Sequence, residues 1–146
     1  MHCPAVVGAL SAAQNFSTLV GATGCLTPTA DAFLVLYRAG DVDGFRTLAK
    51  ANSAGAQLYA LCGLKHLGAD ADAKALRKML SSSRQKSALQ LGCTGPGPTT
   101  VVSELVLPKD GQAVSPFDSD CDYLVENGAK PFRRPCDSKN ARPTCR

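Results

Sequence analysis

Apolar residues recur at helical spacing through the first two thirds of the chain. Over residues 5–20, one such stripe consists of Val6, Ala9, Leu10, Ala13, Phe16 and Val20. Residues three or four positions apart share one face of an α-helix, so this stripe would be buried along a single face. The pattern therefore predicts a helix over Ala5–Val20, which ends before Gly21 and Gly24.

Four further helices are expected because each of the following apolar stripes comes after a start signal. The first signal, Thr27-Pro28, combines a capping hydroxyl with proline at the first helical position, and its helix ends at Gly40. The other start signals are Asp41, Asn52-Ser53, and Asp70 or Asp72. The helix that follows Asn52-Ser53 is expected over Ala54–Leu67.

The loops between these four helices contain only two to four residues, so successive helices should become antiparallel neighbours. The stretch Thr27–Ser81 therefore predicts two helical hairpins in succession. In the last of these helices, the apolar side chains expected to point inward are Leu76, Met79 and Leu80. The basic side chains expected to point outward are Lys74, Arg77 and Lys78.

The pattern changes after the fifth expected helix. Ala88–Leu91 predicts a short strand, and Gly95–Pro98 predicts a rigid turn. Val101–Leu107 fits either a second strand or a short helix. From Pro108 onward, Pro, Gly, Asp and Ser dominate, which predicts an irregular region with one brief helix near Tyr123–Glu126. We expect disulfides rather than a hydrophobic core to hold this region.

The composition supports one mainly α domain over residues 1–146. Hydrophobic residues make up 45% of the chain, but aromatics only 5%, and tryptophan is absent. A core of Ala, Leu and Val favours closely packed helices. We expect short antiparallel helical hairpins over residues 5–81 and a small β or irregular, disulfide-stapled part over residues 82–146.

Seven cysteines are spread irregularly, with no Cys-x-x-Cys pair: Cys3, Cys25, Cys62, Cys93, Cys121, Cys136 and Cys145. Structural zinc sites draw ligands in close pairs, whereas wide spacing suits disulfides and an oxidising compartment. No segment approaches the roughly 18 apolar residues of a membrane helix. We expect a secreted, periplasmic or cell-surface protein whose leader was removed, with Met1 added for expression. The alternative is a cytosolic chain that begins at Met1 and keeps reduced thiols.

Two resemblances bear on the helical part. With its short helices and loops, Thr27–Ser81 resembles the αα units of HEAT-like proteins. The run Leu-Tyr-Ala-Leu-Cys-Gly-Leu at Leu58–Leu64, followed by Cys93, is similar to small exported bacterial proteins of unknown function. This resemblance implies a helical fold and a disulfide between Cys62 and Cys93, and it implies no activity.

Other disulfide pairings remain open from the sequence alone, because six cysteines already allow 15 connectivities. A bond between Cys62 and Cys93 would lock the helical part to the strand that follows. A bond between Cys3 and Cys25 would staple the first helix to its return loop. Cys121, Cys136 and Cys145 would then compete, and the cysteine left over would be buried and inert, exposed and reactive, or paired between chains.

Charge is distributed in blocks, although the net charge is only +4. No charged residue precedes Asp31, residues 93–127 carry a net charge of −5, and residues 128–146 carry +5. We expect the basic tail to fold back near the acidic stretch, because it contains two cysteines. The alternative is a free tail that seeks an acidic partner.

Cys62 and His66 are four residues apart on one expected helix, so their side chains share a face. This spacing suits a metal site or a thiolate–imidazole pair. The competing interpretation places a partly exposed His66 at the helix end, where it favours the helix dipole, and a disulfide at Cys62.

Three acidic residues, Asp118, Asp120 and Asp122, alternate as in a calcium loop. The pattern departs from an EF-hand because Tyr123 replaces the turn glycine and Ala129 stands where a bidentate glutamate is required. Capping of a following helix is the stronger interpretation. We therefore predict no metal and no cofactor, with these three residues as weak metal candidates.

A basic helix face provides an alternative binding surface. Its candidate residues for an anionic ligand are Lys74, Arg77, Lys78, Arg84 and Lys86. No aromatic residues interleave with them for base stacking, so we do not expect nucleic-acid binding.

Phosphate loops, dinucleotide fingerprints and metalloprotease motifs are absent, which disfavours an enzyme. The leading hypothesis is an exported, disulfide-stabilised structural or protein-interaction module that self-assembles or binds a protein partner. The alternatives are a binding protein for an anionic ligand and a small thiol enzyme or hydrolase.

Overall fold

The computed structural model describes residues 3–20, 24–92, 97–128, 130, 134–136 and 145, except for the side chains of residues 91 and 92. The helices are α1 (Pro4–Ser11), α2 (Pro28–Arg38), α3 (Val42–Ala49), α4 (Ala54–His66), α5 (Asp70–Leu80), α6 (Val102–Val106) and α7 (Pro116–Gly128). The strands are β1 (Phe16–Val20), β2 (Cys25–Leu26), β3 (Lys86–Ser87), β4 (Leu89–Gly92) and β5 (Thr100–Val101). The described part is therefore mainly helical with a small β component, as the sequence predicts.

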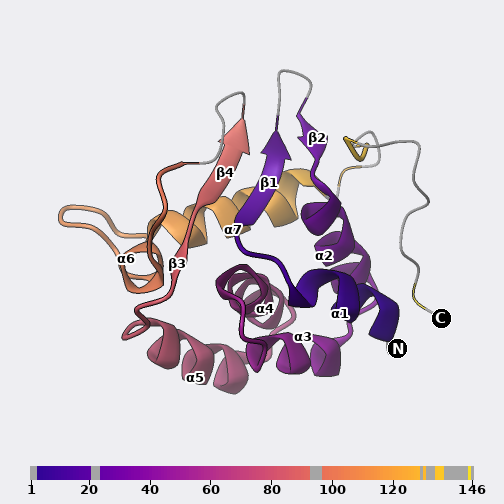
Figure 1. Cartoon of the computed structure of the whole chain (residues 1–146), viewed down its shortest axis with the longest axis horizontal. Coiled ribbons are helices and arrows are strands. Elements are labelled where there is room, and N and C mark those ends of the chain that lie inside the picture. The colour runs from indigo at the N-terminus through magenta and orange to yellow at the C-terminus, as the bar shows by residue number, and fades with distance from the viewer. Residues whose placement is uncertain are drawn as a thin grey trace.

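Helix α4 forms the centre of the molecule, and every residue from Ala54 to Leu64 is buried. Figure 1 shows α4 nearly end-on, with α3 and α5 below it and β1 and α7 above it. The start of α4 follows from Ser53, whose hydroxyl accepts a hydrogen bond from the amide of Ala56 at 3.3 Å. An apolar helix without a polar face must be buried on all sides, and α4 meets this requirement.

The sequence also predicts two further helices, α2 and α3, correctly. Thr27 caps α2 by accepting from the amide of Ala30, and Asp41 caps α3 by accepting from the amide of Gly44. In α5, however, Asp70 and Asp72 lie within the first turn and make no side-chain cap, so the expected cap is wrong. Acidic residues still stabilise this turn because they oppose the positive end of the helix dipole.

The expected helix over Ala5–Val20 is wrong in its second half. Only Pro4–Ser11 is helical, and Phe16–Val20 forms the central strand of a three-stranded sheet of order β2-β1-β4. Strand β1 runs antiparallel to β2, with Leu19 opposite Leu26, and parallel to β4, with Phe16 opposite Leu89. The buried hydroxyl of Tyr59 fixes β1 on α4, because it donates to the carbonyl of Ser17 at 2.7 Å and accepts from its amide at 3.0 Å.

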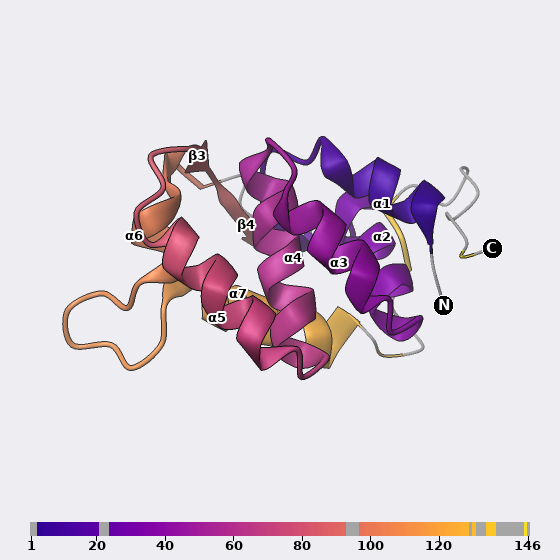
Figure 2. The same ribbon diagram turned by 90° about the horizontal axis from the view of Figure 1, so that it is seen from below.

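The segment Val101–Leu107 contains both of the alternatives that its sequence allows. Thr100–Val101 pairs with β3 as a short antiparallel strand, and Val102–Val106 continues as helix α6. Figure 2 shows a loop that projects from the body between α6 and α7, over residues 107–115. A turn at Gly111, whose φ is 79°, reverses this loop.

The expectation of an irregular C-terminal region is wrong over Pro116–Gly128, where α7 spans 13 residues. The Ser115 hydroxyl accepts from the Asp118 amide at 3.0 Å, which is a helix-capping bond. Phe117, Cys121 and Leu124 are fully buried against the core. Helix α7 therefore forms part of the core, and disulfides are not its sole support.

Three disulfides join sequence-distant cysteines: Cys3–Cys145, Cys25–Cys136 and Cys62–Cys121. The predicted pairs Cys3–Cys25 and Cys62–Cys93 are therefore wrong. Cys93 lies outside the described residues, so the environment of the seventh cysteine is not described. Three disulfides in a chain of this size indicate an oxidising compartment.

Two described residues of the basic tail, Cys136 and Cys145, are bonded to cysteines in the N-terminal half of the molecule. Cys136 bonds to β2, and its amide donates to the carbonyl of Leu26 at 2.7 Å. In α7, Asp118 and Asp122 form ion pairs with α4 and α5. Most of the tail lies outside the described residues, so its expected return to the acidic stretch stays a prediction. Within the described ranges, no helix is both long and apolar enough to cross a membrane.

Candidate functional site

The Cys62–His66 pair does not form a thiol site. Cys62 is bonded to Cys121, and both residues are fully buried. A ring nitrogen of His66 lies within 4.8 Å of both sulfur atoms, but the disulfide removes the thiolates that a metal or a nucleophile would need. Nucleophilic catalysis by Cys62 is therefore excluded in the disulfide-bonded protein.

Around this disulfide, a network of charges fastens α7 to α4 and α5. Arg77 donates two hydrogen bonds to Asp118, at 2.6 and 2.9 Å. Lys65 lies 3.1 Å from Asp122, and the His66 Nε2 atom lies 2.9 Å from the same carboxylate oxygen. Asp118 and Asp122 therefore face α4 and α5, and their ion pairs hold α7 against these two helices.

Asp118 is the most enclosed acid of this network. Burial opposes its ionisation, but hydrogen bonds from Arg77 and Ser115 and the nearby positive charges outweigh burial and lower its pKa below the ordinary value. Arg77 also donates to the carbonyl of Val106 at 3.2 Å. Both ends of the projecting loop are thus anchored to Arg77, one directly and the other through Asp118 and Ser115.

The three acidic candidates for calcium do not converge. Asp118 and Asp122 lie one helical turn apart on α7 and face Lys65, whereas Asp120 lines a separate cavity. They do not form a ligand cluster among the described residues, where the one such group contains Cys62, His66 and Cys121. The cause is α-helical geometry, which places positions i and i+2 on different faces.

The five basic residues predicted to bind an anionic ligand do not form one exposed face. Arg77 is half-buried against Asp118, whereas the side chains that remain exposed are Lys74, Lys78, Arg84 and Lys86. The residue at the centre of the predicted basic face is therefore engaged in a structural ion pair.

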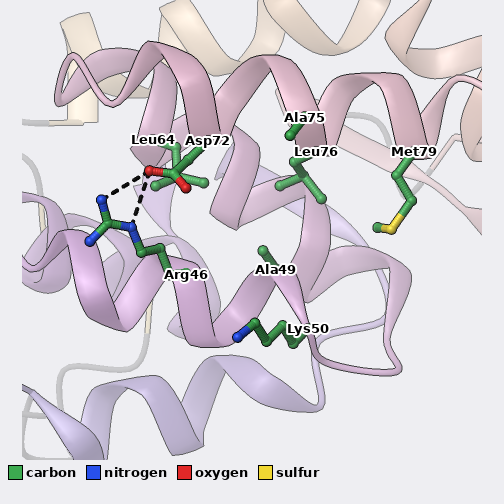
Figure 3. A pocket seen from close by; sticks show the side chains of 8 residues that line it. All are labelled: Arg46, Ala49, Lys50, Leu64, Asp72, Ala75, Leu76 and Met79. Carbon is green, nitrogen blue, oxygen red and sulfur yellow. Dashed lines mark hydrogen bonds and ion pairs between the residues drawn. The ribbon is translucent and has the colours of Figure 1, made fainter.

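A different surface feature was not expected from the sequence, namely an open groove between α3 and α5. Its volume is about 320 Å³, and Figure 3 shows Ala49 on one wall, Ala75 and Leu76 on the other, and Leu64 of α4 at its floor. Met79 was expected to point inward, but its side chain is 49% exposed at one end of the groove. An exposed methionine beside small residues is typical of adaptable binding surfaces.

The two ends of this groove differ in charge. At one end Arg46 pairs with Asp72 at 3.0 Å, as the dashed lines in Figure 3 show. Farther along the α3 wall lies Lys50, whose side chain makes no hydrogen bond or ion pair within the part of the chain that the structure describes. The groove therefore combines an apolar centre with one acidic group and one available cation.

A second cavity, of about 580 Å³, lies between the projecting loop, β4 and the start of α7. Asp120 lines it together with the following residues: Leu89, Lys109, Gln112, Ala113, Val114, Ser115, Pro116 and Ser119. Burial raises the pKa of Asp120 from 3.8 to about 6. A perturbed carboxyl in a cavity is a feature of functional sites.

We expect Asp120→Asn to stabilise the protein by about 1–2 kcal/mol at pH 7.5, because it removes a half-buried charge that solvent screens only in part. The folded pKa of about 6 lies above the unfolded value of 3.8, so the wild type loses stability as the pH rises between these values. Urea denaturation at pH 7.5 and pH 3.5 tests this prediction. The advantage of the variant should disappear at pH 3.5, and an equal gain at both values would contradict the assignment.

Comparison with known proteins gives no relative. No family model matches the chain, no curated protein matches it, and no solved structure matches it. The two surfaces described above are therefore the basis for any statement about function.

Proposed function

We propose that this protein is an exported, disulfide-stabilised interaction module that self-associates through the groove between α3 and α5. The observation that carries the proposal is the exposed apolar lining of the groove, with Met79 protruding beside Ala49 and Ala75. The oxidising setting indicated by the disulfides supports the exported part of the proposal.

The groove is self-complementary in shape. Met79 is long, flexible and unbranched, whereas Ala49 and Ala75 leave space beside it. In a two-fold symmetric dimer, the same patch faces itself, so Met79 of each subunit can fill the space beside the alanines of the other.

The groove is also complementary in charge under the same symmetry. A two-fold axis that runs across the groove at its centre brings Lys50 of one subunit toward Asp72 of the partner subunit. Asp72 already pairs with Arg46, at 3.0 Å, and its carboxylate can accept a second cation. This arrangement favours a second copy of the chain over a uniformly acidic or basic partner.

The expected association is weak. Asp72 and Met79 are seven residues apart on α5, which corresponds to about 10 Å of groove. A stable interface buries about 800 Å² on each side, so the groove supplies only part of a standard interface. Self-association should therefore become visible only at high protein concentration.

We expect Ala75→Glu to weaken self-association about tenfold or more, because it places a charge in the centre of the apolar contact. Sedimentation equilibrium over a wide concentration range measures this effect. The matched control is Ala71→Glu, an identical change at another exposed position of α5 that does not line the groove.

The control should self-associate as the wild type does. A wild-type protein that stays monomeric at all concentrations would contradict the proposal. Equal weakening by Ala75→Glu and Ala71→Glu would also contradict a contact in this groove. The added negative charge alone would then explain the loss of self-association, whatever its position.

A further inference from the structure

The cavity beside α7 contains a carboxylate that has no partner among the described residues. The side chain of Asp120 is half-buried and makes no hydrogen bond or ion pair with the described residues, and burial is the sole cause of its raised pKa. The neighbouring acids differ, because Asp118 and Asp122 are both engaged by cations. Taking a carboxylate from water without a compensating donor costs free energy, so Asp120 lowers the stability of the unliganded protein.

We propose that this cavity binds a small organic ammonium ion, with Asp120 as its counterion and the apolar wall around the alkyl part of the ligand. The proposal is independent of self-association, because the cavity and the α3–α5 groove share no lining residue.

The lining residues favour this ligand class over a metal ion. Asp120 is the sole carboxylate among the described residues that line the cavity. Calcium takes six to eight oxygen ligands, and zinc prefers nitrogen and sulfur ligands, so one carboxylate is a poor site for either. An ammonium group, in contrast, needs a single negative charge and a few acceptors, which Asp120, Gln112 and Ser119 can provide.

The remaining walls fit a short alkyl chain. Leu89 of β4, Pro116 of α7 and Val114 of the loop supply apolar surface, and Val114 is 47% exposed in the unliganded protein. A ligand that contacts Val114 would cover one of the few large apolar side chains that the described residues leave exposed. Aromatic rings, which could stack on a planar ligand, are absent from the lining residues.

Lys109 is the charged residue that competes with the proposed ligand. It is exposed at the rim of the cavity and makes no ion pair with the described residues. Other basic side chains near α7 have partners outside this cavity, namely Asp118, Asp122, Asn127 or the carbonyl of Gly128: Lys65, His66, Arg77, Arg38 and Lys130. Glu104 of α6 accepts from Thr100. Removal of the Lys109 charge should therefore strengthen, or leave unchanged, the binding of a cation.

The test is an NMR titration of the ¹⁵N-labelled full chain with n-butylammonium chloride at constant ionic strength. We expect saturable shifts of the amides of Gln112, Ser119 and Asp120. Asp120→Asn, which keeps the size of the side chain and should fold stably, is expected to weaken binding at least tenfold. The matched control, Asp110→Asn, removes the same charge from the projecting loop outside this cavity and should bind within about threefold of the wild type.

The dependence on pH gives a second readout. With a pKa of about 6, Asp120 is mostly protonated at pH 5 and mostly ionised at pH 7.5. Butylammonium should therefore bind about tenfold more weakly at pH 5. Asp120→Asn should abolish this pH dependence.

Four results would overturn the proposal. They are the absence of saturable shifts, an equal response to the neutral isostere 1-butanol, unchanged binding in Asp120→Asn, and loss of binding in Lys109→Gln. The last result would show that binding depends on Lys109 and not on attraction between the ligand charge and Asp120. Self-association is measured separately without butylammonium, so failure of either proposal leaves the other testable.

Discussion

We expect Gly55→Ala to lower the free energy of unfolding by about 2–3 kcal/mol, although alanine is the better helix former. A Cβ atom at this position of α4 would lie 2.7 Å from both the carbonyl carbon of Ala13 and the amide nitrogen of Asn15. These are backbone atoms, and the carbonyl of Ala13 is held by the amide of Ala56 at 3.1 Å and by the hydroxyl of Ser53. The segment cannot move away without breaking these hydrogen bonds.

Gly8→Ala is the matched control, because it makes the same change inside helix α1. No atom lies within 4 Å of a Cβ built at Gly8, and its φ is not positive. This substitution should stabilise the protein by about 0.5–1 kcal/mol through helix propensity alone. Urea denaturation of both variants measures the difference, and a Gly55→Ala protein as stable as Gly8→Ala would show that α4 does not pack against Ala13.

Removal of the Cys62–Cys121 disulfide should have the largest effect on stability. The double substitution Cys62→Ala and Cys121→Ala is expected to cost about 4 kcal/mol, because the bond closes a long loop and both positions are fully buried. The sequence separation of the two cysteines is 59 residues. The loss should concentrate in α7, which the bond joins to α4.

Guanidinium denaturation without reductant measures this cost, and hydrogen exchange identifies the region that opens. The wild type in a thiol reductant is the control, and it should lose more stability than the double variant because two further disulfides are then broken. A cost below about 1 kcal/mol, with unchanged protection in α7, would contradict the role assigned to this bond.

Local signals explain which helices could be predicted from the sequence. Thr27, Asp41 and Ser53 cap α2, α3 and α4 through bonds to amides three residues ahead, so the information lies within one turn. The same signal is present at Ser115-Pro116, where it could have located the start of α7. The Pro, Gly, Asp and Ser content of the surrounding loop obscured it.

Long-range partners explain what the sequence could not provide. Phe16–Val20 has apolar residues at helical spacing, yet it is a strand because β4, about 70 residues later, pairs with it. The disulfide pairings were missed for the same reason, since Cys3 and Cys145 are 142 residues apart. Local periodicity contains no information about such contacts.

The two candidate surfaces could not be predicted from the sequence, because they depend on how the helices pack against one another. The exposure of Met79 depends on the position of α3 beside α5, whereas its helical spacing alone suggested an inward position. The environments of Asp118 and Asp120 differ because α7 is a helix. Its geometry places Asp118 against Arg77 and Asp120 in a cavity. The sequence identified these carboxylates as notable residues but placed them before a brief helix near Tyr123–Glu126, as its caps, whereas they lie within α7.

The most direct test of an exported, disulfide-stapled module is peptide mapping of the native protein without reduction, after alkylation of free thiols. The expected result is three linked peptide pairs, Cys3–Cys145, Cys25–Cys136 and Cys62–Cys121, with the Cys93 peptide outside them. Recovery of alkylated Cys62 and Cys121 would contradict this arrangement, because it would reopen thiol chemistry beside His66 and remove the link between α4 and α7.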